Sequence, residues 1–201
     1  MERYPVVLDF ALSSDVVSVV ANYLKCVPVM SSTLPVCVRF VESSAQYDDA
    51  PETPHDSQLY RMDYYSNPNV YMLVLLEDVT PDKGPFCFLP QNASRKVAAK
   101  VRNGARGVGY RSSDEEIYSA VDRSEMIEFS YPRGTVLFIN PSVCFHFGSR
   151  NCVQPRYQLM YGYTGACRTD MSELFMTPKL YPLREADSRL RQMLLRKKFT
   201  A

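Results

Sequence analysis

Short apolar segments separated by turn signals fill the middle of this chain of 201 residues. Apolar runs bounded by Gly, Pro, Asn and Asp are typical of β-strands. We expect strands in VCVRFVES (36–43), SQLYRMDYY (57–65), VYMLVLLEDV (70–79), PFCFLP (85–90), MIEFSYPRGTVLFIN (126–140, two strands), CFHFG (144–148) and RYQLMYGYTG (156–165). The segments SNPN (66–69), TPDKG (80–84) and Pro132–Gly134 are the turns between them, and Gly84 suits a positive φ. The pattern predicts seven or eight short strands.

Four further segments predict helices outside these strands. They are 14–25 with Ser14 as its N-cap, 94–104 ended by Gly104, 113–122 headed by a Ser113/Glu116 capping box, and the tail 182–198. Helical spacing places Val16, Val20, Tyr23 and Leu24 on the buried face of the first helix, and Leu183, Leu190, Met193 and Leu194 on that of the last. Short strands with helices around them predict a mainly β fold with flanking helices, a double-stranded β-helix or cupin-like jelly roll.

Length and net charge limit the number of domains and the classes of partner that we expect. With 46% hydrophobic residues the chain can bury one core, so we expect a single domain, 1–201, with an N-terminal helical region and a C-terminal helix. A net charge of +1 gives no reason to expect nucleic acid as a partner, and no apolar run approaches the roughly 20 residues of a membrane helix. We expect a cytoplasmic protein with a small-molecule substrate and no membrane partner, and the sequence does not indicate an oligomeric state. The six cysteines contain no CxxC pair, and most lie in apolar segments as core residues.

Four residues in the strand region carry candidate chemistry. Arg61 and Asp63 alternate along one expected strand and would project from the same face. His146 lies on a later strand, and Arg156 follows ten residues on. A carboxylate and an imidazole can share a divalent metal, and a guanidinium binds a carboxylate through two parallel hydrogen bonds. His146 as a hydrogen-bonded core histidine, Asp63 as the salt-bridge partner of Arg61, and Arg156 as the partner of a buried carboxylate are the structural alternatives.

Two stretches resemble a known family. The segment from SQLYRMDYY to DVTPDKGPFCFLP, followed by GTVLFINPSVCFHFGSRN and PRYQLMYGY, is similar to the phytanoyl-CoA dioxygenase-like group of non-haem Fe(II)/2-oxoglutarate oxygenases. The resemblance covers roughly residues 57–165. It implies that Asp63 and His146 are metal ligands and that Arg156 binds the distal carboxylate of 2-oxoglutarate. It also implies a dioxygenase, an oxidoreductase that hydroxylates a small organic substrate.

Arg61 departs from the family pattern. The family's first histidine ligand, two residues before the aspartate, falls on Arg61. A guanidinium has no lone pair to offer a metal and stays protonated. Arg61 therefore marks a degenerate metal position, where it would pair with Asp63 and weaken binding of Fe(II). Two lesser departures are Tyr71, where many members have a lysine, and the segment QNAS after Pro90.

His55 is a possible substitute ligand, because it lies in the polar loop 45–56 that precedes the strand of Asp63. A solvated loop histidine without a role is the alternative. The sequence thus leaves two functions open. One is an Fe(II)/2-oxoglutarate-dependent oxygenase, and the other is a catalytically inactive protein of the same fold that binds an anion or 2-oxoglutarate at Arg156.

Overall fold

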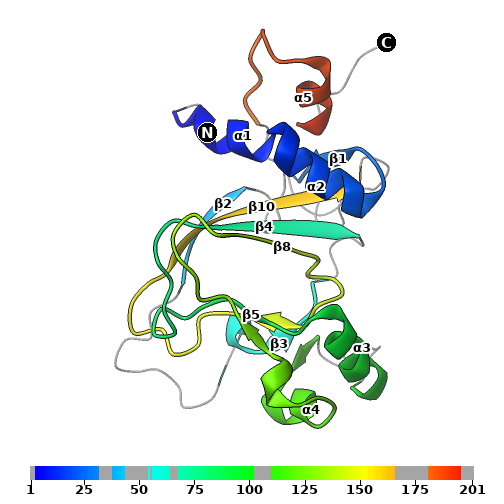
Figure 1. The fold of residues 1–201 in the computed structure, drawn as a ribbon, viewed down its shortest axis with the longest axis vertical. Helices are drawn as coiled ribbons and strands as arrows, with labels where there is room; N and C mark the ends of the chain where they lie inside the picture. The colour runs from blue at the N-terminus through cyan, green and yellow to red at the C-terminus, as the bar shows by residue number, and fades with distance from the viewer. Residues whose placement is uncertain are drawn as a thin grey trace. The chain divides into compact units, whose positions relative to one another are not determined.

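The computed structural model describes residues 3–31, 38–43, 54, 56–63, 68–101, 110–165 and 181–195. Its helices are α1 (Pro5–Ala11), α2 (Ser14–Leu24), α3 (Gln91–Lys100), α4 (Asp114–Tyr118) and α5 (Arg189–Leu194), with 3-10 turns η1 (Asp56–Gln58) and η2 (Arg123–Glu125). Its strands are β1 (Pro28–Met30), β2 (Arg39–Glu42), β3 (Tyr60–Arg61), β4 (Asn69–Leu75), β5 (Cys87–Phe88), β6 (Arg111–Ser112), β7 (Ile127–Glu128), β8 (Val136–Ile139), β9 (His146–Phe147) and β10 (Tyr157–Gly165). Figure 1 shows these elements along the chain.

The strands form two five-stranded sheets. One has the order β1-β10-β4-β8, with β2 also paired to β10, and the other has the order β6-β3-β9-β5-β7. In the second sheet, each of these neighbouring pairs is antiparallel. The expectation of a mainly β chain with flanking helices is confirmed.

The contacts of the chain cluster into two units, and β2, β4 and β10 each contribute residues to both. The first unit comprises Met1–Arg39, Tyr65–Met72 and Met160–Ala201, and the second comprises Phe40–Tyr64 and Leu73–Leu159. The single-domain organisation stays a prediction. All described candidate residues, Arg61, Asp63, His146 and Arg156, belong to the second unit.

In the first unit, α1 is fastened to β10 by two buried tyrosines. Tyr161 donates a hydrogen bond to the carbonyl oxygen of Val7 at 3.1 Å, and Tyr163 donates one to that of Ala11 at 2.9 Å. Both aromatic rings are fully buried, so these bonds satisfy hydroxyl groups that water does not reach. Among the described residues no single helix is long and apolar enough to cross a membrane. Only α1 and α2 together reach that length and composition, and they are bent by 46°.

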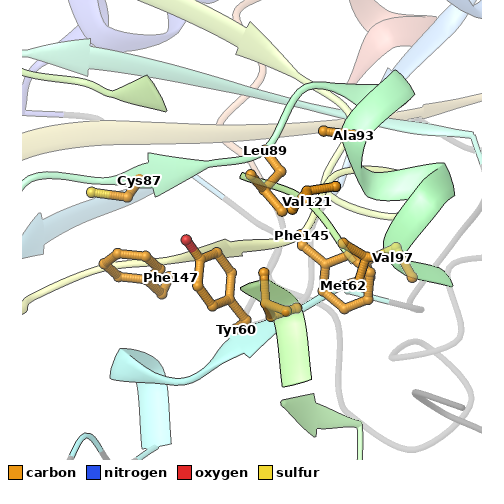
Figure 2. Close-up of a cluster of buried hydrophobic side chains, with 10 residues drawn as sticks. Tyr60, Met62, Cys87, Leu89, Ala93, Val97, Val121, Phe145 and Phe147 are labelled. Carbon is orange, nitrogen blue, oxygen red and sulfur yellow. The ribbon is translucent and has the colours of Figure 1, made fainter. Parts of the chain in front are cut away.

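In the second unit, α3 and α4 pack against the second sheet through one hydrophobic cluster (Figure 2). The cluster combines side chains from β3, β5, β9 and both helices, and it forms an apolar core of this unit. Its buried members are Tyr60, Met62, Cys87, Leu89, Ala93, Val97, Ile117, Val121, Phe145 and Phe147.

Several expected boundaries are wrong in detail. The N-cap of α2 is Ser13 rather than Ser14, and Tyr23 is half exposed on it. Helix α3 begins at Gln91, three residues before the expected start, because the Ser94 hydroxyl serves the core rather than a cap. Helix α3 also ends earlier than expected, at Lys100 with an extended Val101, while Gly104 lies outside the described residues.

The C-terminal helix is shorter than predicted. It begins at Arg189, and only Leu194 of its four expected inward residues is buried, while Leu183, Leu190 and Met193 are at least 40% exposed. Hydrogen bonds to Asp187 stabilise the segment that precedes this helix. That carboxylate accepts hydrogen bonds from the backbone N–H and the guanidinium of Arg184, which hold residues 184–187 in a turn.

Candidate functional site

Arg61, Asp63 and His146 come together where β3 meets β9. Arg61 and His146 are direct partners across the antiparallel pair. Asp63 Oδ1 lies 3.5 Å from Arg61 Nε and 3.7 Å from His146 Nε2. We call these three residues the Arg61 cluster.

The strand that was expected to carry Arg61 and Asp63 ends at Arg61. The backbone N–H of Asp63 donates to the carbonyl oxygen of Pro141 at 2.9 Å, so Asp63 lies just beyond β3. The alternation argument for a shared strand face is therefore wrong. The expected salt bridge between the two side chains is confirmed all the same. Arg61 also donates from Nη1 to the carbonyl oxygen of Ser57 at 3.0 Å, which fixes the guanidinium.

His146 is a buried, neutral imidazole. Its side chain is 1% exposed and stacks on Phe86 with ring centroids 5.3 Å apart. Burial lowers its pKa below the ordinary 6.5, which outweighs the opposing effect of the Asp63 charge. Nδ1 lies 3.0 Å from the carbonyl oxygen of Cys144. A carbonyl only accepts, so Nδ1 carries the proton and Nε2 turns its lone pair toward Asp63.

The described residues do not supply the complete iron site that the resemblance implies. Within the described ranges, no three His, Cys, Asp or Glu side chains come together as a metal site. Asp63 and His146 offer two ligand atoms, while Arg61 offers a positive charge in place of a third. His55, the possible substitute ligand, lies outside the described residues.

Arg156 is held rigidly by its backbone. Its N–H donates to Ser43 Oγ at 2.7 Å, and its carbonyl oxygen accepts from the Ser43 N–H at 2.9 Å. The whole residue is 3% exposed, and Nε donates to the carbonyl oxygen of Gly84 at 3.1 Å. The two bonds to Ser43, the residue after β2, fix the backbone position from which the Arg156 side chain extends.

The outer end of the Arg156 guanidinium lacks a protein partner. Nη1 is buried and has no hydrogen-bond partner among the described residues, and the carboxylate of Glu77, whose charge acts on Arg156, is itself paired with Lys83. Burial lowers the pKa of Arg156 to about 10. A buried cation without a counterion is costly. The arrangement therefore suits an anionic group that comes from a ligand.

Two glycines lie beside this side chain. A Cβ on Gly148 would lie 3.7 Å from Arg156 Nη2. Alternate residues of an extended segment share a face, so Nη2 lies on the face of β9 that carries His146. Gly84 has φ +60, and a Cβ there would lie 2.8 Å from Cys152 Cβ, so only glycine fits. Ser43 and Gly148 were not expected from the sequence, whereas Gly84 was marked by its turn.

The opposite face of β5 and β9 carries a separate small pocket. Cys87 and Phe147 are partners across these strands and point away from His146. The pocket measures about 160 Å³ and includes Arg123 and Arg150 in its lining. Both arginines pair with Asp114, so one carboxylate is shared between two guanidinium groups.

Comparisons with known proteins identify the fold. No protein-family model matches the sequence, and no curated protein matches it. Among solved structures, EctD from S. alaskensis with 2-oxoglutarate and 5-hydroxyectoine is 14% identical, with a TM-score of 0.58 over 98% of this chain and 62% of that chain. The apo form of EctD gives 14% identity and a TM-score of 0.54, over 82% of this chain and 54% of that chain.

A third similar structure is HygX from Streptomyces hygroscopicus with nickel, 2-oxoglutarate and hygromycin B. It is 14% identical, with a TM-score of 0.50, over 83% of this chain and 67% of that chain. This chain thus spans only 62% and 54% of the two EctD structures. The likeness establishes the fold, a double-stranded β-helix shared with these structures.

Proposed function

We propose that this protein binds a small carboxylate, 2-oxoglutarate or a related acid, at Arg156, and that the Arg61 cluster replaces the iron site. The observation that carries the proposal is the buried Arg156 guanidinium, whose Nη1 has no partner among the described residues. A carboxylate matches two N–H groups of a guanidinium at once, and a water-excluded setting strengthens both bonds. The likeness of the fold to proteins solved with 2-oxoglutarate supports this choice of acid.

The charges of the Arg61 cluster support the second half of the proposal. Arg61 neutralises Asp63, and His146 is neutral, so the three side chains together carry no net charge. A divalent cation would have to approach a carboxylate that a guanidinium already contacts. The cluster is therefore a poor competitor for Fe(II), and we regard Arg61 as the residue that removes iron-dependent chemistry.

Calorimetric titration with 2-oxoglutarate tests the carboxylate site. We expect wild-type protein to bind it and Arg156→Met to bind it about ten- to a hundred-fold more weakly, as the loss of a charged hydrogen-bonded pair predicts. Arg133→Met is the matched control, because Arg133 is an exposed arginine of the same unit and its loss should change nothing. Equal affinity in wild type and Arg156→Met would refute the proposal.

A second candidate is an active Fe(II)/2-oxoglutarate oxygenase acting on a small organic substrate. One observation favours it: the lone pair of His146 Nε2 and Asp63 Oδ1 face each other at 3.7 Å, and two acceptors need a cation or a donor between them. In this case His55 would supply a third ligand. Arg61 opposes it, for the reason given above.

Anaerobic Fe(II) titration in the presence of 2-oxoglutarate separates the two candidates. The weak visible charge-transfer band of an iron chelate should be absent from wild type and appear in Arg61→His, which supplies an imidazole as a metal ligand. Arg61→Gln is the control that removes the charge without adding such a ligand. A band in wild type that His55→Ala abolishes would instead show that His55 helps to bind iron and would favour the oxygenase candidate.

We further propose that the protein is cytoplasmic, with a small molecule as its partner and neither nucleic acid nor a membrane. The net charge of +1 supports this proposal. Cell fractionation tests the location directly.

A further inference from the structure

Gln158, two residues after Arg156 on β10, also has a buried side-chain atom without a hydrogen-bond partner among the described residues. Its side chain is buried, with 4% of the residue exposed, while its neighbours Tyr157 and Leu159 are partly exposed. This alternation places Gln158 on the buried face of the strand, the face that Arg156 also occupies. Gln158 Oε1 is buried and has no hydrogen-bond partner among the described residues.

Two neighbouring buried groups with open hydrogen-bonding capacity are unusual in a folded protein. Leaving such a group unpaired costs on the order of 1–3 kcal/mol, and native proteins pair nearly all of them. Arg156 Nη1 can only donate, and Gln158 Oε1 can only accept. A single ligand satisfies both if it presents an anionic acceptor to the first and a hydrogen-bond donor to the second.

We infer that Gln158 is a specificity-determining residue of the Arg156 site, and that the ligand is a carboxylate which also carries a hydroxyl or N–H donor. This inference rests on the proposed carboxylate site and narrows its ligand class. At neutral pH 2-oxoglutarate carries only acceptors, so it would leave Gln158 Oε1 unpaired. The Cα atoms of alternate residues in a strand lie about 6.6–6.8 Å apart, and the two side chains differ in length, so the test uses acids of several lengths.

Matched pairs of acids test this requirement on the wild-type protein. We would titrate 3-hydroxypropanoate, 4-hydroxybutanoate and 5-hydroxypentanoate, each against the unsubstituted acid of the same length. One net hydrogen bond is expected to favour the hydroxy acid of the best-fitting length about five-fold. The same hydroxy acid should also bind more tightly than 2-oxoglutarate.

Gln158→Met then assigns the preference to the amide. Methionine keeps the length and burial of the side chain but removes the strong acceptor, so the five-fold preference should vanish while the affinity for the unsubstituted acid stays within about two-fold. Retained binding of the unsubstituted acid also shows that the variant is folded. A preference that survives in Gln158→Met overturns the assignment.

The remaining outcomes separate this inference from the proposal beneath it. If acids bind in an Arg156-dependent way with no preference for a hydroxyl group, or if 2-oxoglutarate binds most tightly, the role of Gln158 is refuted and the carboxylate site stands. If no acid, 2-oxoglutarate included, gives a signal that Arg156→Met removes, both are refuted, and ordered water satisfies the two groups.

Discussion

Arg156, which is buried, and Arg150, which is partly exposed, show two uses of the same residue type. Arg150 makes contacts of 2.8 and 3.1 Å to the two oxygens of Asp114, and its Nε donates to the carbonyl oxygen of Gln58. Arg156 makes one side-chain bond, to Gly84, and leaves Nη1 without a partner among the described residues. The first arrangement stabilises the fold, and the second keeps a charge for a ligand.

This contrast predicts opposite effects of the same substitution on stability. Without ligand, Arg156→Met should leave the free energy of unfolding unchanged or raise it by about 1 kcal/mol, because an uncompensated buried charge is removed. Arg150→Met should lower it by about 2–3 kcal/mol, because it leaves the Asp114 carboxylate without this partner. Urea denaturation of both variants measures the difference. Equal losses of stability would mean that Arg156 has a protein partner.

At the scale of single elements, α4 is held by its first turn. Ser113 Oγ accepts from the backbone N–H of Glu116 at 3.2 Å, and the Glu116 carboxylate accepts from the N–H of Ser113 at 2.9 Å. This is the capping box that the sequence predicts. Ser13 occupies the same position in α2 but makes no side-chain capping bond.

The two caps give a matched pair of substitutions. Ser113→Ala should lower the free energy of unfolding by about 1 kcal/mol, because the backbone N–H of Glu116 at the start of α4 loses its side-chain acceptor. Ser13→Ala should lower it by no more than about 0.3 kcal/mol, since no capping bond is lost. Thermal unfolding by circular dichroism measures both. A larger loss in Ser13→Ala would contradict the assignment of the caps.

The elements also show what local sequence reasoning can and cannot reach. The Ser113 capping box and the positive φ of Gly84 depend on a few adjacent residues, and both were predicted. The end of β3 and the start of α3 depend on distant partners. Pro141 takes the Asp63 N–H, and Ser94 Oγ donates to Leu89 and accepts from the Phe145 N–H. Such contacts leave no periodic pattern in the sequence.

Across the whole molecule, β4 and β10 each contribute residues to both units. The division falls between Met72 and Leu73 on β4, and between Leu159 and Met160 on β10. Unfolding one unit alone would end both strands midway and leave backbone groups of the remaining halves without their ladder partners. The continuity of these strands favours one cooperative unit, and the single domain expected from length stays a prediction.

We therefore predict one unfolding transition, which a bound carboxylate shifts as a whole. Far-UV circular dichroism and tyrosine fluorescence should give coincident urea curves, because all parts of the chain unfold in the same transition. The 14 tyrosines serve as the fluorescence probe, since the chain has no tryptophan to dominate emission. At a free concentration of 100 times its wild-type Kd, the acid should raise the free energy of unfolding of the wild type by about 2.7 kcal/mol, and that of Arg156→Met, which binds it about ten- to a hundred-fold more weakly, by only about 0.4–1.4 kcal/mol. Two separate transitions, only one of them moved by the acid, would show that the second unit folds alone with the carboxylate site inside it.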